Sequence, residues 1–196
     1  MRHVSFVDIV IVACGTLSLE LNHLCEQGFL DPKQVLYNTP GLHQDVAELE
    51  RQLSRKIEKA KALSDKVLVV YGGKFCYVNV DEPTRLMQTI IQEQGNGVTR
   101  IEATHCMDMI ASEEEREQIA SEIAGDEAVW WMTPGWIKIR NQVFNGWDQG
   151  MANENFPRHS GGAVVLDGIG YLDKYMAIRG RLADMVPQRG KGSYSG

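Results

Sequence analysis

The sequence predicts an α/β fold, a doubly wound and mostly parallel open sheet of the Rossmann-like type in a single domain. Short apolar segments alternate with segments of helical periodicity about five times along the chain. The apolar segments are continuous, which is typical of parallel strands that are buried on both faces. We expect this domain to cover residues 1–186, and the Gly-, Ser- and Arg-containing residues 187–196 to form a flexible tail.

The first half of the chain predicts three strands and two helices. The strands are β-rich apolar runs, and each helix shows apolar residues that recur every three or four positions. In chain order we expect a strand over 7–13 (VDIVIVA), a short leucine-containing helix that stops near Gly28, a strand over 34–37, a long amphipathic helix over 43–63, and a strand over 66–71 (KVLVVY) that is closed by Gly72 and Gly73.

The second half repeats this alternation with one irregular region. We expect a helix that Pro83 opens and Gly95 ends, a strand over 98–102, a helix over 107–123, a strand over 129–132 that Thr133-Pro134-Gly135 stops, a strand over 163–166 and a helix over 171–185. Residues 136–159 are polar and aromatic and show no clear period. Proline and glycine predict that 133–136 form a sharp turn out of the preceding strand.

Charge and composition exclude several classes of function. The formal net charge is −6 and the pI is about 5.4, so the chain lacks the basic balance of a nucleic-acid-binding protein. No apolar run approaches the roughly 18 residues that span a bilayer. The apolar stretch over 6–13 is too short for a span, contains Asp8 and is not followed by a cleavage site. These features predict a cytoplasmic protein that binds neither membrane nor nucleic acid.

Four cysteines carry the most specific chemical signal. Four in an acidic chain of 196 residues do not look like a disulfide framework. Cys25 lies among leucines on a predicted helix and is expected to be a core residue. Cys14, Cys76 and Cys106 each follow a predicted strand, at the sheet edge where open α/β proteins bind ligands.

These three cysteines predict a metal site. If their strands are neighbours, the three sulfur atoms should lie within about 7 Å of one another, as a shared metal or cluster requires. Thiolates select an iron–sulfur cluster, zinc or copper(I), and three protein ligands leave a fourth position open. The cysteines come from separate strand ends without a paired motif, which favours an iron–sulfur cluster over zinc. The alternative is that they are small core residues.

Further candidates lie at the same predicted edge. His105, His43 and Asp108 are the candidate catalytic residues, with His105 also a candidate fourth metal ligand. The alternatives are a loop histidine for His105, a helix cap for His43 and a favourable charge at a helix start for Asp108. The candidate cofactor-binding residues are Gly15, Gly72, Gly73 and Trp136. Tryptophan is also common in cores and interfaces, and no phosphate-loop or nucleophile motif is present.

The motifs at the strand ends resemble those of the domain of unknown function 1638 family. They are Ala13-Cys14-Gly15, Gly41-Leu42-His43, Tyr71-Gly72-Gly73 with Cys76, His105-Cys106, Met132-Thr133-Pro134-Gly135-Trp136-Ile137 and Leu166-Asp167-Gly168-Ile169-Gly170. The resemblance covers nearly the whole chain and implies an α/β fold with cysteines at these motifs. It also implies a setting in anaerobic metabolism, near corrinoid-dependent methyl-transfer systems.

Two departures from the family pattern concern the site. Cys76 is followed by Tyr77, where the family has glycine, and Thr104-His105-Cys106 replaces its His-Asp-Cys order. The resemblance therefore does not assign a role to His105.

Together these features predict a metal-binding α/β protein that acts on or delivers a small thiol or methyl compound. The alternative function is a non-catalytic accessory module that binds a corrinoid or a nucleotide, with corrinoid the less favoured cofactor. A small-molecule ligand and a corrinoid or methyltransferase protein are the expected partners. The sequence leaves open whether the site is catalytic and whether the chain forms a homo-oligomer.

Overall fold

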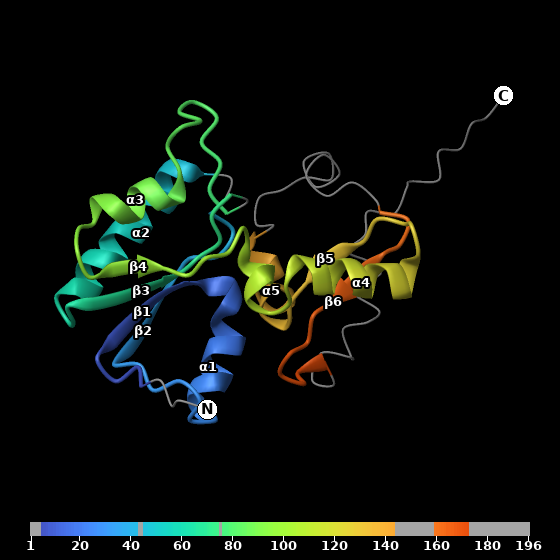
Figure 1. The fold of residues 1–196 in the computed structure, drawn as a ribbon, viewed down its shortest axis with the longest axis horizontal. Helices are drawn as coiled ribbons and strands as arrows, with labels where there is room; N and C mark the ends of the chain where they lie inside the picture. The colour runs from blue at the N-terminus through green and yellow to red at the C-terminus, as the bar shows by residue number, and fades with distance from the viewer. Residues whose placement is uncertain (1–4, 43–44, 75, 144–158, 173–196) are drawn as a thin grey trace.

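Figure 1 shows the computed structural model, which describes residues 5–42, 45–74, 76–143 and 159–172. The strands are β1 (Ile9–Cys14), β2 (Gln34–Asn38), β3 (Lys66–Val70), β4 (Val98–Arg100), β5 (Trp130–Met132) and β6 (Ala163–Val165). The helices are α1 (Ser18–Glu26), α2 (Val46–Lys61), α3 (Met87–Glu93), α4 (Glu113–Ala124) and α5 (Pro134–Val143). Two short 3-10 helices, η1 (Gly15–Leu17) and η3 (Cys106–Met109), follow β1 and β4.

The central sheet confirms the predicted α/β fold class. Its strand order is β2-β1-β3-β4, and every neighbouring pair is parallel. β1 lies inside the sheet, with Cys14 opposite Asn38 of β2 and Ala13 opposite Val70 of β3. The carboxyl ends of β1, β3 and β4 therefore meet at one edge, because all strands run in the same direction.

Helices cover both faces of the sheet. α2 and α3 lie on one face and α1 on the other (Figure 1). Val10 and Val12 of β1 pack toward α2 and α3, whereas Ile11 and Ala13 pack in a second cluster with α1. All four side chains are almost fully buried, which explains why β1 is continuously apolar in sequence.

The last two strands do not extend this sheet but form a separate parallel pair, β5-β6. β4 ends at Arg100, whose Nη1 donates to the carbonyl oxygens of Tyr71 (3.1 Å), Ile101 (2.8 Å) and Ala103 (3.1 Å). The Arg100 side chain thus ties the segment that follows β4 to the end of β3.

The helix predicted over 107–123 is divided into η3 and α4. Ser112 begins α4 with a capping box, in which its Oγ accepts from the Glu115 backbone (3.2 Å) and Glu115 accepts from the Ser112 backbone (2.7 Å). The helix expected to open at Pro83 begins later, at Met87. Apolar periodicity had located both segments but not their true starts.

The predicted turn at 133–136 is instead the start of α5. The Thr133 Oγ1 accepts a hydrogen bond from the Trp136 backbone (3.1 Å), and Pro134 occupies the first helical position, where no backbone donor is needed. α5 packs beside η1 and α1 (Figure 1), and the buried Glu20 of α1 accepts from the Gly135 backbone at 3.4 Å. The sequence did not predict this helix, because the residues after 136 show no clear helical periodicity of apolar side chains.

Several expectations lie outside the described residues. These are most of the predicted helix over 171–185 and the tail 187–196, so the extent of the predicted single domain stays a prediction. None of the helices in the described ranges combines the length and apolar character needed to cross a membrane.

Candidate functional site: three thiols at the strand ends

The sheet topology brings Cys14, Cys76 and Cys106 to one edge; we call them the three-thiol cluster. Cys14 is the last residue of β1, Cys76 lies in the loop after β3, and Cys106 begins η3 after β4. The three strands are neighbours in the order β1-β3-β4. Cys25, by contrast, packs on α1 with the core cluster around Leu21, as its sequence setting predicts.

The thiols of the cluster touch one another. The Sγ atoms of Cys76 and Cys106 lie 3.5 Å apart, and Cys14 lies close enough to Cys106 for the two thiols to influence each other's pKa. The Thr16 hydroxyl donates to Cys14 Sγ at 3.0 Å. Cys14 and Cys76 are 1% and 4% exposed, whereas Cys106 is partly exposed and contacts the cores on both faces of the sheet. All three are free thiols.

The interactions between the three thiols shift their pKa values in different directions. A hydrogen bond to Cys106 and burial raise the pKa of Cys14 well above its usual value. A hydrogen bond from Cys14 lowers the pKa of Cys106, but the bond to Cys76 and burial outweigh it and raise that pKa to about 12. A hydrogen bond from Cys106 lowers the pKa of Cys76 against the effect of burial. Cys76 is therefore the thiol that ionises most readily.

Gly72 lets the strand-end loops approach. A Cβ at Gly72 would stand 2.6 Å from Cys76 Sγ and would also overlap the His105 backbone. The next residue, Gly73, donates its backbone N–H to the Ala103 carbonyl at 2.8 Å. These glycines, expected to bind a cofactor, thus have a packing function, and their contact with a cofactor stays a prediction.

Gly15 is also closely packed. A Cβ there would stand 2.6 Å from the Asn38 carbonyl oxygen and 3.0 Å from Pro40 Cδ. The chain leaving β1 is therefore held against the chain leaving β2. As at Gly72, cofactor binding by Gly15 stays a prediction.

Two buried polar residues beside Cys14 were missed in the sequence. Asn38 is 2% exposed, and its amide lies beside the Tyr71 hydroxyl, but neither amide atom has a well-formed hydrogen bond to the described residues. Tyr71 is 1% exposed, and burial together with Cys14 raises the pKa of its hydroxyl. Asn38 ends a strand, and its position alone could have identified it, because ligands bind at such ends.

Asp108 connects the His105 segment to a buried arginine. Its Oδ2 accepts from the Thr104 backbone (2.6 Å), and its Oδ1 lies 2.8 Å from Arg116 Nη1 and 2.9 Å from His105 Nδ1. The two contacts at Oδ1 have ion-pair distances, although their angles do not suit a hydrogen bond. Arg116 is 6% exposed and was not recognised in the sequence. Asp108 thereby supports the loop that bears Cys106, and catalysis by His105 or Asp108 stays a prediction.

The start of α5 reaches the same edge as the cluster. A Cβ at Gly135 would overlap the carbonyl oxygen of Thr16, the residue whose hydroxyl binds Cys14. Trp136 follows directly and is partly buried. Its expected place beside the thiols stays a prediction. His43, the remaining catalytic candidate, lies outside the described residues.

The cluster is not a preformed metal site. Within the described ranges, no group of three or more His, Cys, Asp or Glu side chains is arranged to hold a metal ion as it stands. Cys76 and Cys106 are hydrogen-bonded to each other instead, and Cys14 accepts from the Thr16 hydroxyl. To bind a metal they would have to lose protons and turn toward a common centre, as metal binding commonly requires.

One family model matches the chain, over residues 37–186, and it is described as a protein of unknown function, DUF1638. The match covers more than half of the 196 residues. The chain belongs to the DUF1638 family. No curated protein and no solved structure matches it.

The DUF1638 match includes two members of the cluster, Cys76 and Cys106, while Cys14 precedes the matched residues. It also includes Asp108, Arg116 and the Thr133–Trp136 segment at the start of α5. The resemblance to this family that the strand-end motifs suggest is therefore confirmed. The family description assigns no activity, so function has to be argued from the site.

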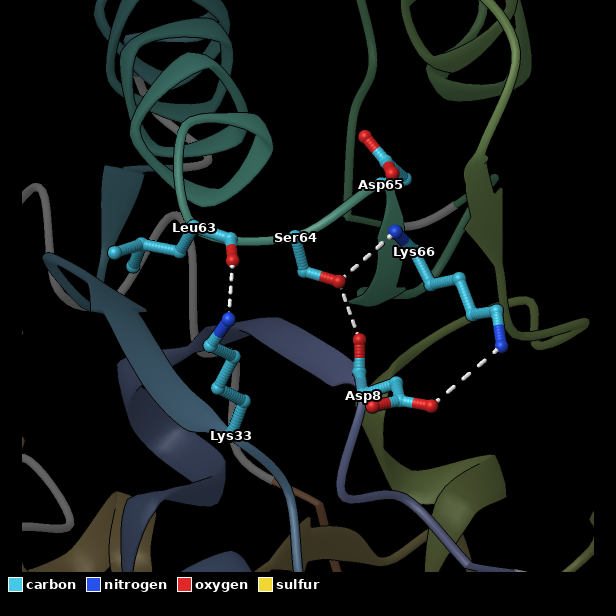
Figure 2. Close-up of a pocket in the computed structure, with 6 residues that line it drawn as sticks. All are labelled: Asp8, Lys33, Leu63, Ser64, Asp65 and Lys66. Carbon is cyan, nitrogen blue, oxygen red and sulfur yellow. Dashed lines mark hydrogen bonds and ion pairs between the residues drawn. The ribbon is translucent and has the colours of Figure 1, made fainter.

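A surface pocket of this DUF1638 protein lies at the opposite end of the sheet (Figure 2). Its polar groups are engaged with one another, since Lys33 Nζ donates to the Leu63 carbonyl (2.7 Å) and Ser64 Oγ donates to the Asp8 carbonyl. Lys66 Nζ lies 3.9 Å from Asp8 Oδ2. This pocket is at the amino ends of β1 and β3, where open α/β sheets do not place their ligands, and we assign it no function.

Proposed function

We propose that the three-thiol cluster binds a thiophilic metal centre that acts on, or delivers, a small thiol or methyl compound. The observation that carries this proposal is the convergence of three free thiols from three neighbouring strand ends. Buried inert cysteines do not need to touch, and soft sulfur ligands select zinc, copper(I) or iron–sulfur clusters.

The distance between the thiols favours zinc over the cluster that the sequence suggested. Zinc–sulfur bonds of about 2.3 Å in a tetrahedron place two sulfurs about 3.8 Å apart. The Cys76 and Cys106 sulfurs are 3.5 Å apart, close to that value. A cubane cluster binds its cysteines through different irons, which requires wider spacing. We therefore propose zinc first, with the cluster as the alternative that the experiment reads out.

The chain's own residues suit such a site. Cys76, with its lowered pKa, would be the first ligand to ionise, and Cys14 and Cys106 would follow. A zinc ion with three protein ligands would keep a position for a small thiol, which it would hold as the reactive thiolate. The Asn38 amide, with hydrogen-bonding capacity left, would orient a polar group of that ligand.

Metal analysis of protein purified without oxygen tests the proposal. We expect about one zinc per chain, and loss of most of it in Cys76→Ser and Cys106→Ser, because each variant removes one of three ligands. Cobalt(II) exchange should give sulfur-to-metal absorption in the parent protein. Cys25→Ser is the matched control and should retain the metal, at a stability cost of about 1 kcal/mol.

The other outcomes are informative. A colourless protein without bound metal in every preparation would refute the metal proposal. A brown protein with iron would assign the cluster, and a pink protein would indicate the corrinoid-binding module. Loss of metal in Cys25→Ser, with the fold intact by circular dichroism, would show that a different set of cysteines binds it.

Trp136→Ala examines whether the start of α5 shields the site. Because Trp136 follows the contact between Gly135 and Thr16, we expect it to exclude water from the thiols, which strengthens the interactions of charged groups there. The variant should release metal to a chelator about ten-fold faster, with its oligomeric state unchanged. Dissociation of an oligomer in size-exclusion chromatography, with metal release unaffected, would instead identify Trp136 as an interface residue.

A further inference from the structure

We propose that Cys76 and Cys106 also form a modification site, in which a low-molecular-weight disulfide of the glutathione type converts them to an intramolecular disulfide. Their sulfurs are 3.5 Å apart, and a disulfide bond is about 2.05 Å long, so closure needs a shift of about 1.5 Å. The two thiols are in direct contact, although the cysteines are separated by 30 positions in the sequence.

The positions of the two cysteines favour this closure over one with Cys14. Cys76 lies in a loop and Cys106 at the start of η3, so both belong to segments outside the regular ladder of the sheet. Cys14 is the last paired residue of β1 and is held by the Thr16 hydroxyl at 3.0 Å. A shift at Cys14 would therefore disturb the sheet, whereas a shift at Cys76 or Cys106 would not.

The exchange takes place in two steps, and either sulfur of the pair can take the first one because the two lie in contact. One sulfur of the pair, having lost its proton, attacks one sulfur of the small disulfide and releases one thiol. The other sulfur then attacks the protein sulfur of the mixed disulfide and releases the second thiol. Two protein thiols are oxidised, one small disulfide is reduced to two thiols, and both protons pass to the released thiolates.

The disulfide would control the metal site, a consequence that rests on the proposed function. Sulfurs joined to each other are no longer thiolate ligands, so oxidation would leave only Cys14 of the cluster available. Bound zinc would conversely hold both sulfurs and protect them. The disulfide itself rests only on the geometry of the two thiols.

Treatment of the full-length, chelator-stripped protein with oxidised glutathione tests the inference. We expect the four free thiols to fall to two, with a mass loss of two hydrogens and a cross-linked peptide containing Cys76 and Cys106. Cys76→Ser and Cys106→Ser should each stop at a stable glutathione adduct on the cysteine of the pair that remains. Cys25→Ser is the matched control and should form the same cross-link as the parent protein.

The inference is overturned if all four thiols survive, if only an adduct forms in the parent protein, or if Cys14 appears in the cross-link. Its failure is distinguishable from failure of the proposed function. If the untreated protein contains zinc but no disulfide forms after the metal is stripped, the metal site is supported and the modification site is refuted. If the Cys76–Cys106 disulfide forms in a protein that never binds metal, the modification site is supported and the proposed metal site is refuted.

Discussion

Gly72→Ala is expected to destabilise the protein by about 3 kcal/mol and to abolish the proposed metal binding, because overpacking at a close contact forces the backbone to move. The added methyl group would stand 2.6 Å from Cys76 Sγ and overlap the His105 backbone. The loops that carry Cys76 and Cys106 would have to separate. Urea unfolding followed by metal analysis measures both effects.

Gly168→Ala is the matched control for this prediction. Gly168 lies after β6, and the nearest atom to its added methyl group would be Ile110 Cγ2 at an ordinary 3.7 Å. We expect its stability to change by less than about 0.5 kcal/mol. Equal behaviour of Gly72→Ala and Gly168→Ala would show that the close approach at Gly72 does not hold the cluster together.

Asp108→Asn is expected to cost about 3 kcal/mol of unfolding free energy, because removal of one partner leaves a buried charge uncompensated. Arg116 is 6% exposed, and Asp108 is the carboxylate 2.8 Å from its guanidinium. An asparagine would also place an amide N–H, which is a donor, against a group that is itself a donor. That group would be either the Arg116 guanidinium or the Thr104 backbone N–H, which donates to Asp108 at 2.6 Å. Thermal and urea unfolding of the variant measure the loss.

A double variant separates the charge from the shape of the side chain. Asp108→Asn combined with Arg116→Met removes both charges, and we expect it to recover at least half of the loss. Metal content should follow the same order, because Asp108 supports the loop that begins η3 with Cys106. A double variant that is less stable than Asp108→Asn alone would contradict the buried ion pair as the source of the effect.

The contribution of Asp108 also depends on pH. Although burial raises its pKa, hydrogen bonds from Thr104 and His105 and the Arg116 guanidinium lower it well below the usual value. The stabilisation is therefore complete above the unfolded pKa of about 3.9 and is lost as the pH falls through the folded pKa. The difference in stability between the parent protein and Asp108→Asn should be largest near pH 7 and should shrink below about pH 4. A difference that stays constant through this range would mean that the charge is not involved.

Local sequence patterns predicted the parallel strands and the edge at which the candidate site lies. The continuous apolar runs of β1 and β3 predict parallel strands, since burial on both faces leaves no polar alternation. Because parallel strands end at one edge, the positions of Cys14, Cys76 and Cys106 predicted that they share this edge. Their meeting also required the strand order β1-β3-β4, which only the structure gives. The helix α5 was not predictable in this way, because the Thr133-Pro134-Gly135 pattern also suits a turn.

Tertiary structure alone decided how the cysteines meet and what supports them. The 3.5 Å contact between Cys76 and Cys106 depends on Gly72 lying against His105, a backbone approach between segments remote in sequence. The pairing of Asp108 with Arg116 likewise depends on how α4 packs, because a charged residue on an acidic helix carries no local sign that it is buried. Sequence thus determined the strands and the edge at which the thiols gather, whereas distances and partners there follow from long-range packing that no local pattern encodes.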